Sequence, residues 1–402
     1  MIFLERIIRH INADYRKRAK ALEDRGVWAY IFSSSGYVLA VVLIITSILM
    51  TITGEFVISA RTSIGIINKY KNRVRAIYLA KSGIELAKYV LYSDQKGAAS
   101  MAMGISSERD VDSYNDLWAF DFPPIPIDEG TLTIKIQDEQ AKINLSVLAN
   151  EFVDKSPYYA IVQNFFINLG FNPDAADGIL DWVDIDDTPS AYGAESDYYG
   201  SKNPRYSARN EAMESIDDLL LIKGITPEMY YGLGGGNFGK ERNLVEHNRG
   251  TLYFDTGKLL DMSKKSKELK KESGKEVTHK IGPEVSRRLD NYFRVYGERS
   301  NYLDDLNKIN INTASYRVLS ALTADMSDDT VTEMIMRRLI EPFKSINEIS
   351  DLITDNDTRK NLLTTKSSMF KITSTASFGN ATIAISAVYN RDMRKIIYWS
   401  EE

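Results

Sequence analysis

Residues 37–53 form an unbroken apolar stretch, YVLAVVLIITSILMTIT, inside a run from Gly26 to Gly54 that carries no charge. A helix needs about 20 mostly apolar residues to cross the hydrocarbon core of a bilayer. No second stretch of this kind occurs in the sequence. The sequence therefore predicts one membrane-spanning segment, residues 37–57, and a body that is attached to the membrane through its N-terminal end.

The charges that flank this segment indicate its orientation. Seven Lys and Arg residues precede it, and five follow within residues 61–75. The positive-inside rule then weakly places residues 1–36, a basic leader, in the cytoplasm. A secretory signal would end at a small-x-small cleavage site, which is absent here, because the apolar run continues into a second helical pattern. We expect the helix to be kept as an anchor.

Composition narrows the function of the body. The net charge is −5 over 402 residues, and the first 36 residues hold seven basic and four acidic side chains, so the remainder carries −8. An acidic body argues against general nucleic-acid binding. The chain has no cysteine and three histidines. Disulfides and thiolate metal sites are therefore excluded, and little material remains for a zinc site or a histidine-based catalytic group.

The pattern after the span predicts an α+β fold. Residues 58–92 continue as an amphipathic helix whose apolar stripe recurs at three- and four-residue spacing: Ile77, Ala80, Ile84, Ala87 and Leu91. Such a stripe must pack on another element. Alternating strand patterns occur at 131–137 and 142–147, and three more follow from residue 369 as an antiparallel meander. We expect residues 58–149 and 367–402 to build one small sheet.

Residues 150–366, between the two groups of strands, predict a large α-helical insert. Thr226-Pro227 and Ser327 are helix-start signals, and Ser215 and Ser345 begin capping-box patterns. The two halves look alike, which indicates two similar helical modules of the SAM-like or helix-hairpin-helix-like type. Residues 234–280 between them are rich in Gly, Lys and Glu and predict a polar, solvated linker.

The start of the apolar helix resembles that of type IV pilin-like proteins. Gly36 stands directly before Tyr37, which opens the helix, and this order resembles a prepilin peptidase cleavage site. Ser33-Ser34-Ser35 occupies the place where such sites usually carry a basic residue. An uncleaved anchor with an incidental glycine is the alternative.

Several blocks extend the resemblance to one family, the minor pseudopilin K proteins of type II secretion, also called general secretion pathway protein K. The blocks are QDEQAKINL at 137–145, ILDWVDIDDTPSAYGAESDYYG at 179–200, SIDDLLLIKGITPEMYYGL at 215–233 and ININTASYRVLSAL at 309–322. The resemblance implies a pilin fold whose small sheet is interrupted by a large helical domain. It implies no catalysis.

The same resemblance implies where the protein works and with what. The chain would be a single-pass protein of the inner membrane with its C-terminal body in the periplasm. It would lie at the tip of the pseudopilus with the I-type and J-type minor pseudopilins, above the major pseudopilin. It would be a substrate of prepilin peptidase, act with the inner-membrane secretion platform, and bind no nucleic acid.

Val41 occupies the fifth position after the predicted cleavage site. Most pilins carry a glutamate there, which can pair with the N-terminal amine of a neighbouring subunit. An unpaired carboxylate among apolar helices costs several kcal/mol. Valine therefore suits a subunit that has no neighbour above it, although it also suits an ordinary lipid-facing anchor.

An acidic cluster is the candidate metal site. It contains Asp181 and, as the ligands we predict, Asp184, Asp186, Asp187, Glu195 and Asp197. Oxygen-only ligands in a loop suit Ca²⁺. Pro189 stands where an EF-hand needs glycine, so the site is of another type. The family resemblance also implies calcium in this domain, in a structural role. A solvated loop whose carboxylates cap helices is the alternative.

A membrane-anchored DNA-binding protein is the second function that the sequence suggests. Residues 219–230 and 310–353 resemble helix-hairpin-helix repeats, which bind phosphate through a Gly-x-Gly turn. The first turn here is Gly224-Ile225-Thr226, but the second, at 325–329, has no glycine and three aspartates. Such a turn repels phosphate. We therefore expect protein-binding modules. A membrane-anchored enzyme is disfavoured because no nucleophile, base and orienting group occur together.

Overall fold

The computed structural model describes residues 13–20, 36–96, 111–149, 157–232, 288–297 and 304–401. The chain divides into two compact units, residues 1–72 and 73–402. Most of the predicted leader lies outside the described residues, with residues 13–20 forming a short exposed helix. The predicted linker at 234–280 lies outside them entirely.

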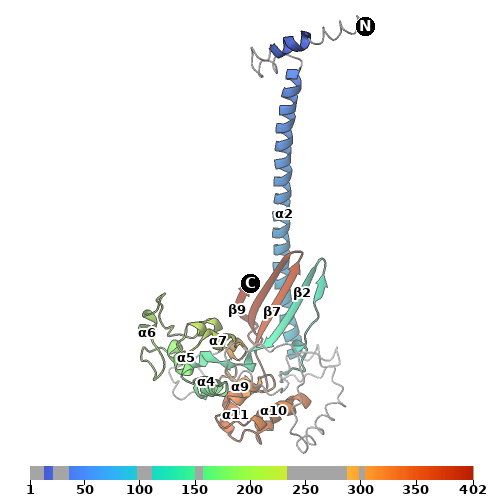
Figure 1. Cartoon of the computed structure of the whole chain (residues 1–402). Coiled ribbons are helices and arrows are strands. Elements are labelled where there is room, and N and C mark those ends of the chain that lie inside the picture. Colours follow the sequence, from blue (N-terminus) through green and yellow to red (C-terminus); the bar gives the residue numbers. More distant parts are fainter. Residues whose placement is uncertain are drawn as a thin grey trace, which may run out of the picture. The chain divides into compact units, whose positions relative to one another are not determined.

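Helix α2, Gly36–Gln95, is 60 residues long and includes the predicted span (Figure 1). Its most apolar window of 18 residues has a mean hydropathy of 2.3, and none of that window is buried in the protein. Among the described residues it is the single helix that is long and apolar enough to cross a membrane. Its exposed apolar surface is what a membrane anchor requires.

The part of α2 in the second unit carries the predicted apolar stripe. Its buried members are Ala76, Ala80, Ile84, Ala87 and Leu91, all 0% exposed. Ile77, which the sequence placed in the stripe, is half-buried and packs at its edge. Ala76 takes its place in the buried stripe. The stripe packs on the sheet together with Trp118 and apolar residues of the strands, which form one hydrophobic core.

Gly83 sets how closely α2 approaches the sheet. A Cβ at this position would lie 2.1 Å from Ser374 Oγ and 2.9 Å from Leu132 Cδ1. Contacts this short are not tolerated, so any larger residue here requires the side chains of Ser374 and Leu132, or the helix itself, to shift. A residue that weakens a free helix is used here for close packing.

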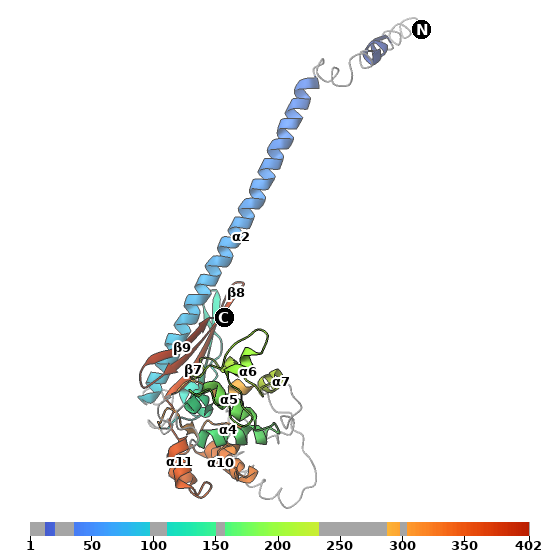
Figure 2. The same ribbon diagram turned by 90° about the vertical axis from the view of Figure 1, so that its left-hand side faces the viewer.

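The sheet has five antiparallel strands in the order β1-β2-β7-β8-β9, four of which are labelled across Figures 1 and 2. Their bounds are β1 Ile125–Ile127, β2 Gly130–Asp138, β7 Met369–Phe378, β8 Ala381–Asn390 and β9 Lys395–Glu401. Strand β2 pairs with β7 from Gly130 opposite Phe378 to Asp138 opposite Phe370. The predicted meander at the C-terminus and its pairing with the strand at 131–137 are confirmed.

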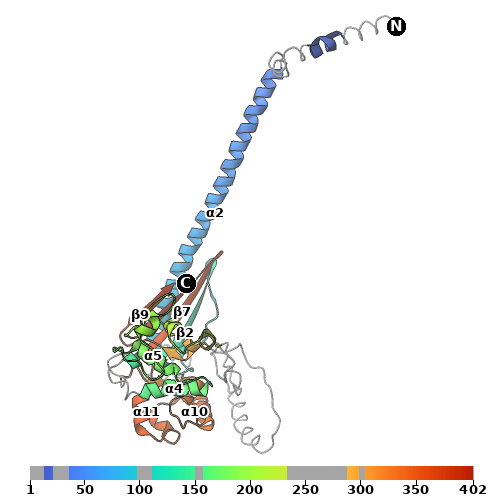
Figure 3. The same cartoon turned by 60° about the vertical axis from the view of Figure 1, so that its left-hand side comes forward.

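The insert lies between β2 and β7, so its ends are held side by side by their pairing. Its helices are α4 Pro157–Asn168, α5 Ala175–Val183, α6 Ser196–Gly200, α7 Pro227–Tyr231, α9 Tyr316–Ser320, α10 Asp328–Ile340 and α11 Asn356–Leu362. Figures 2 and 3 show α4, α10 and α11 grouped at one end of the body. The predicted helical insert is therefore present.

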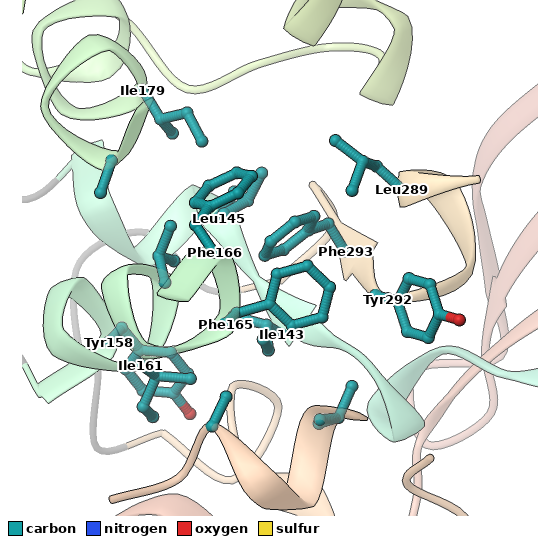
Figure 4. Packing of buried hydrophobic residues seen from close by; sticks show 14 of the residues in the cluster. Ile143, Leu145, Tyr158, Ile161, Phe165, Phe166, Ile179, Leu289, Tyr292 and Phe293 are labelled. Carbon is teal, nitrogen blue, oxygen red and sulfur yellow. The ribbon is translucent and has the colours of Figure 1, made fainter. Parts of the chain in front are cut away.

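A second hydrophobic core fills the insert and includes side chains from both predicted modules. At its centre, in Figure 4, Phe165 of α4 meets Phe293 and Tyr292, with ring centroids 4.7 and 5.4 Å apart. Ile179 and Leu289 point into the same space. Two segments far apart in the sequence thus share one core.

The strand predicted at 142–147 is wrong. Only Ile143–Asn144 is extended (β3), and it pairs in parallel with Phe293–Arg294 (β4) before a 3-10 helix, Leu145–Ala149. Asn144 and Ser146 are buried as fully as the apolar residues between Ile143 and Leu148, so this segment does not alternate between a buried and an exposed face. The insert therefore begins directly after β2, at Glu139 and not at residue 150.

Other local predictions have mixed outcomes. Thr226 and Ser327 cap α7 and α10, each accepting a hydrogen bond from a backbone amide. Ser215 and Ser345 cap 3-10 helices instead of α-helices, at Ile216–Leu221 and Ile346–Ile349. A second parallel pair, Ile309–Asn310 (β5) with Leu363–Thr364 (β6), was not predicted, because two-residue strands leave no periodic pattern in a sequence.

Candidate metal centre

The acidic loop brings three carboxylates together. Asp181 lies in the last turn of α5, Asp184 is its C-cap, and Glu195 is the N-cap of α6. One carboxylate oxygen from each lies within 4.8 Å of the others. Asp181 and Glu195 are buried and Asp184 is half-buried. Of the predicted ligands, Asp184 and Glu195 are therefore adjacent, and Asp181 joins them.

Hydrogen bonds satisfy only part of this group. Both oxygens of Asp181 accept from the backbone amide of Ser190, at 3.1 and 3.0 Å. Both oxygens of Glu195 and Oδ1 of Asp184 are buried without a hydrogen-bond partner in the structure. Buried carboxylate oxygens are rarely left without partners. These three oxygens are therefore available to bind a cation.

Electrostatics lead to the same conclusion. Burial raises the pKa of Asp184 to about 7, and repulsion from Asp186, Asp181 and Asp187 adds to the effect. Burial, followed by repulsion from Asp184 and Asp181, raises the pKa of Glu195 to about 8. No Lys or Arg among the described residues forms an ion pair with Asp181, Asp184 or Glu195. A hard divalent cation would neutralise this charge and occupy the partnerless oxygens.

The loop around the carboxylates is held from several sides. Gly193 passes so close to Asp181 that a Cβ would lie 1.9 Å from Asp181 Oδ2. Lys223 Nζ donates to Gly193 O at 2.7 Å. The amide of Asn210 donates to Trp182 O at 3.1 Å, and its side chain donates to Asp186 O at 3.0 Å. Lys223 and Asn210 lie outside the acidic block, so a ligand motif read from that block cannot contain their contacts.

The other predicted ligands lie apart from the three carboxylates. Asp186 and Asp187 are exposed. Asp186 accepts a hydrogen bond from the Thr188 amide at 2.7 Å, and Asp187 accepts one from Asn210 Nδ2 at 3.0 Å. Asp197 is exposed in the first turn of α6. None of the three belongs to the group whose oxygens lie within 4.8 Å of one another. Our predicted ligand set omitted Asp181. Its i, i+3 spacing to Asp184, at the C-terminal end of α5, was the signal that could have identified it.

The predicted cleavage site lies at the start of α2. Gly36 is the first residue of this helix and Tyr37 the second, while Val41 lies one turn further along. Two threonines of the span satisfy their hydroxyls within the helix: Thr51 Oγ1 and Thr53 Oγ1 donate to carbonyls four residues earlier, at 2.9 and 2.7 Å. Cleavage and the role of Val41 stay predictions.

Two parts of the chain, residues 141–234 and 309–366, match family models described as type II secretion system (T2SS), protein K. The first part contains the acidic loop, and the two lie on either side of the predicted linker. Both parts of the chain are therefore similar to type II secretion system protein K. These secretion protein K regions thus coincide with the insert and not with the anchor.

Curated proteins show the same similarity over part of their length. The chain is 30% identical over 208 residues to type II secretion system protein K of Pectobacterium carotovorum, and 26% identical over 209 residues to that of Aeromonas hydrophila. Each match includes 48% of this chain, and the chain covers 60% of each relative's length.

A solved structure has the same fold. It is a chain from the crystal structure of the GspK-GspI-GspJ complex of the enterotoxigenic Escherichia coli type 2 secretion system, with a TM-score of 0.55 and 14% identity. The match covers 83% of this chain and 98% of that one. At this level of identity the likeness establishes the fold alone, a long helix on a small antiparallel sheet with a large insert.

The DNA-binding alternative gains no support from the described residues. In the second predicted turn, Asp325, Asp328 and Asp329 are exposed, and Ser327 between them caps α10. The place where a helix-hairpin-helix would bind phosphate thus presents carboxylates, which phosphate avoids.

Proposed function

We propose that this protein is a minor pseudopilin of the type II secretion system, anchored in the inner membrane by the first half of α2 with its body in the periplasm. The observation that carries the proposal is the pair of secretion protein K regions in one insert, placed between two paired strands of a pilin-like sheet. The role is structural, in protein export across the outer membrane, and involves no catalysis.

A position at the tip of the pseudopilus is the second part of the proposal. The solved relative comes from a complex named for the K, I and J proteins, which supports the I-type and J-type minor pseudopilins as partners here. Val41 supports a place with no subunit above it, because a glutamate would be left without its partner there. The major pseudopilin, prepilin peptidase and the inner-membrane platform complete the set of partners that we propose.

We also propose that Asp181, Asp184 and Glu195 hold a structural Ca²⁺. Three partnerless buried oxygens and the raised pKa values of Asp184 and Glu195 support this. A bound cation would neutralise the repulsion among these carboxylates and so hold α5, the loop and the start of α6 together. Asp186, Asp187 and Asp197 would contribute long-range attraction.

Processing and assembly test the proposed function. The full chain is co-expressed with a prepilin peptidase and the I-type and J-type pseudopilins, and its intact mass and co-purification are measured beside a Gly36→Leu variant. We expect loss of residues 1–36 in the wild type alone, with both partners retained. An uncleaved wild-type chain that binds neither partner would contradict the proposal.

The calcium proposal is tested by the effect of one variant on the melting temperature, measured without and with calcium. Without calcium, Glu195→Gln should raise the melting temperature, because it removes a repelled buried charge. With calcium, the wild type should gain stability and the variant should not. Asp197→Asn is the matched control, since its side chain is exposed outside the group. Equal calcium responses in Glu195→Gln and wild type would reject this site.

A further inference from the structure

A second group of buried acids lies where α2 ends. Asp94 is in the last turn of α2, and Asp112 and Asp116 belong to the segment that leads to the first strand. One carboxylate oxygen from each lies within 4.8 Å of the others. The three residues are 5%, 2% and 2% exposed. This group is separate in sequence from the acidic loop of the insert and belongs to the pilin-like part of the fold.

One described cation reaches the group. Arg391, from the turn between β8 and β9, donates through both terminal nitrogens to Asp112, at 2.8 and 2.7 Å. Its distance to Asp94 Oδ2 is 3.8 Å. The same guanidinium donates to Ser367 O at 2.5 Å and lies over the Phe370 ring. Both terminal nitrogens of Arg391 are therefore engaged with Asp112 and Ser367, and its single charge balances one of the three acidic groups.

The remaining acids lack sufficient partners. Oδ1 of Asp94 is buried and accepts no hydrogen bond, although its carboxylate belongs to the close group. Asp116 Oδ2 accepts from the Ser113 amide at 2.6 Å and pairs with no described Lys or Arg. Trp118 and Phe370, with ring centroids 5.1 Å apart, line this region and are fully buried. Burial and mutual repulsion raise the pKa of Asp116 to about 8.

The charges of the group do not balance. If all three aspartates were ionised, one guanidinium would leave two negative charges in a water-excluded site, which is costly. One divalent cation would neutralise both, and carboxylates are the ligands that hard cations such as Ca²⁺ prefer. We propose that Asp94, Asp112 and Asp116 form a second divalent-cation site, independent of the one in the insert.

This site would fasten the end of α2 to the sheet and to the insert. Asp112 also accepts from the Ser367 amide at 2.7 Å, just before β7, and its carbonyl accepts from Asn310 Nδ2 at 2.9 Å, in β5 of the insert. A cation held here would join the last turn of α2, the segment after it and the start of β7. The pilin-like part and the insert would thus each carry their own ion.

Counting bound calcium separates the two sites. Calcium per full-length chain in detergent is measured by equilibrium dialysis for the wild type, Glu195→Gln, Asp94→Asn and the double variant. We expect each single variant to lose one ion and the double variant to lose both. Asp121→Asn, an exposed aspartate of the same segment, is the matched control and should keep the wild-type number.

Each outcome decides the proposal. Loss of an ion in Asp94→Asn but not in Asp121→Asn supports the second site, whether or not Glu195→Gln changes the count. A wild-type count in folded Asp94→Asn overturns it and indicates that protons balance the charge. If Asp94→Asn does not fold, as judged by circular dichroism, Asp116→Asn takes its place under the same criterion.

Discussion

Replacing Gly83 by alanine tests the central packing contact of the pilin-like part. The new Cβ would lie 2.1 Å from Ser374 Oγ and 2.9 Å from Leu132 Cδ1, both well inside van der Waals contact. Overpacking of this kind costs about 1–3 kcal/mol, and the short contacts place Gly83→Ala at the upper end. Alanine favours a helix over glycine by about 1 kcal/mol. The expected net loss in unfolding free energy is therefore about 2 kcal/mol.

Two further variants isolate this contact. Gly65→Ala lies in the same helix with no atom within 4 Å of its Cβ, so it should be neutral or stabilising by up to about 1 kcal/mol. Ser374 Oγ is buried without a hydrogen-bond partner, so Ser374→Ala should cost little. The double variant Gly83→Ala/Ser374→Ala should then recover part of the loss, because the 2.1 Å contact is gone while the one to Leu132 stays.

The assay is urea unfolding of the full chain in detergent, followed by tryptophan fluorescence, since Trp118 is buried in the same core. A double-variant cycle should give an interaction free energy of about 1 kcal/mol or more between positions 83 and 374. The reasoning would be refuted if Gly83→Ala were as mild as Gly65→Ala, or if the two substitutions were additive. Either result would mean that the Ser374 and Leu132 side chains do not restrict position 83 as these distances indicate.

Three more predictions concern other parts of the second unit. Burial raises the pKa of Asp138 from 3.8 to about 6, so the folded protein keeps a proton that the unfolded chain releases, and stability should fall as pH rises across this window. Asp138→Asn should remove that fall, of about 3 kcal/mol, in unfolding titrations at pH 4 to 7. Phe165→Ala should cost about 3–5 kcal/mol in thermal unfolding, because it empties the centre of the insert's core. Ser327→Ala, which removes the cap of α10, should cost about 1 kcal/mol; no change would show that the cap is dispensable.

The candidate metal centre was only partly predictable. The acidic block locates the loop, and two of the residues predicted as ligands, Asp184 and Glu195, lie close together in the structure. Asp186, Asp187 and Asp197 have the right chemistry but point to solvent or to Asn210, because the loop's path depends on Gly193, Lys223 and Asn210. Spacing along a loop does not reveal which carboxylates turn inward.

Local patterns determined the parts of the fold that depend on neighbouring residues. The apolar run, the stripe on α2, the alternating strands and the caps at Thr226 and Ser327 all follow from periodicity or from hydrogen bonds within a few residues. The meander at the C-terminus is of the same kind, because hairpins join strands that are adjacent in sequence.

Only the tertiary structure decided what depends on distant segments. The parallel pair β3 and β4 joins residues about 150 positions apart, so the sequence around Ile143 reads as an ordinary strand. The group of Asp94, Asp112 and Asp116 with Arg391 is assembled in the same way, from the end of a helix, a connecting segment and a late turn. Both features have the same physical reason. Backbone pairing and the pairing of buried charges depend on which groups lie close in space, and contacts between distant segments leave no periodic signal along the chain.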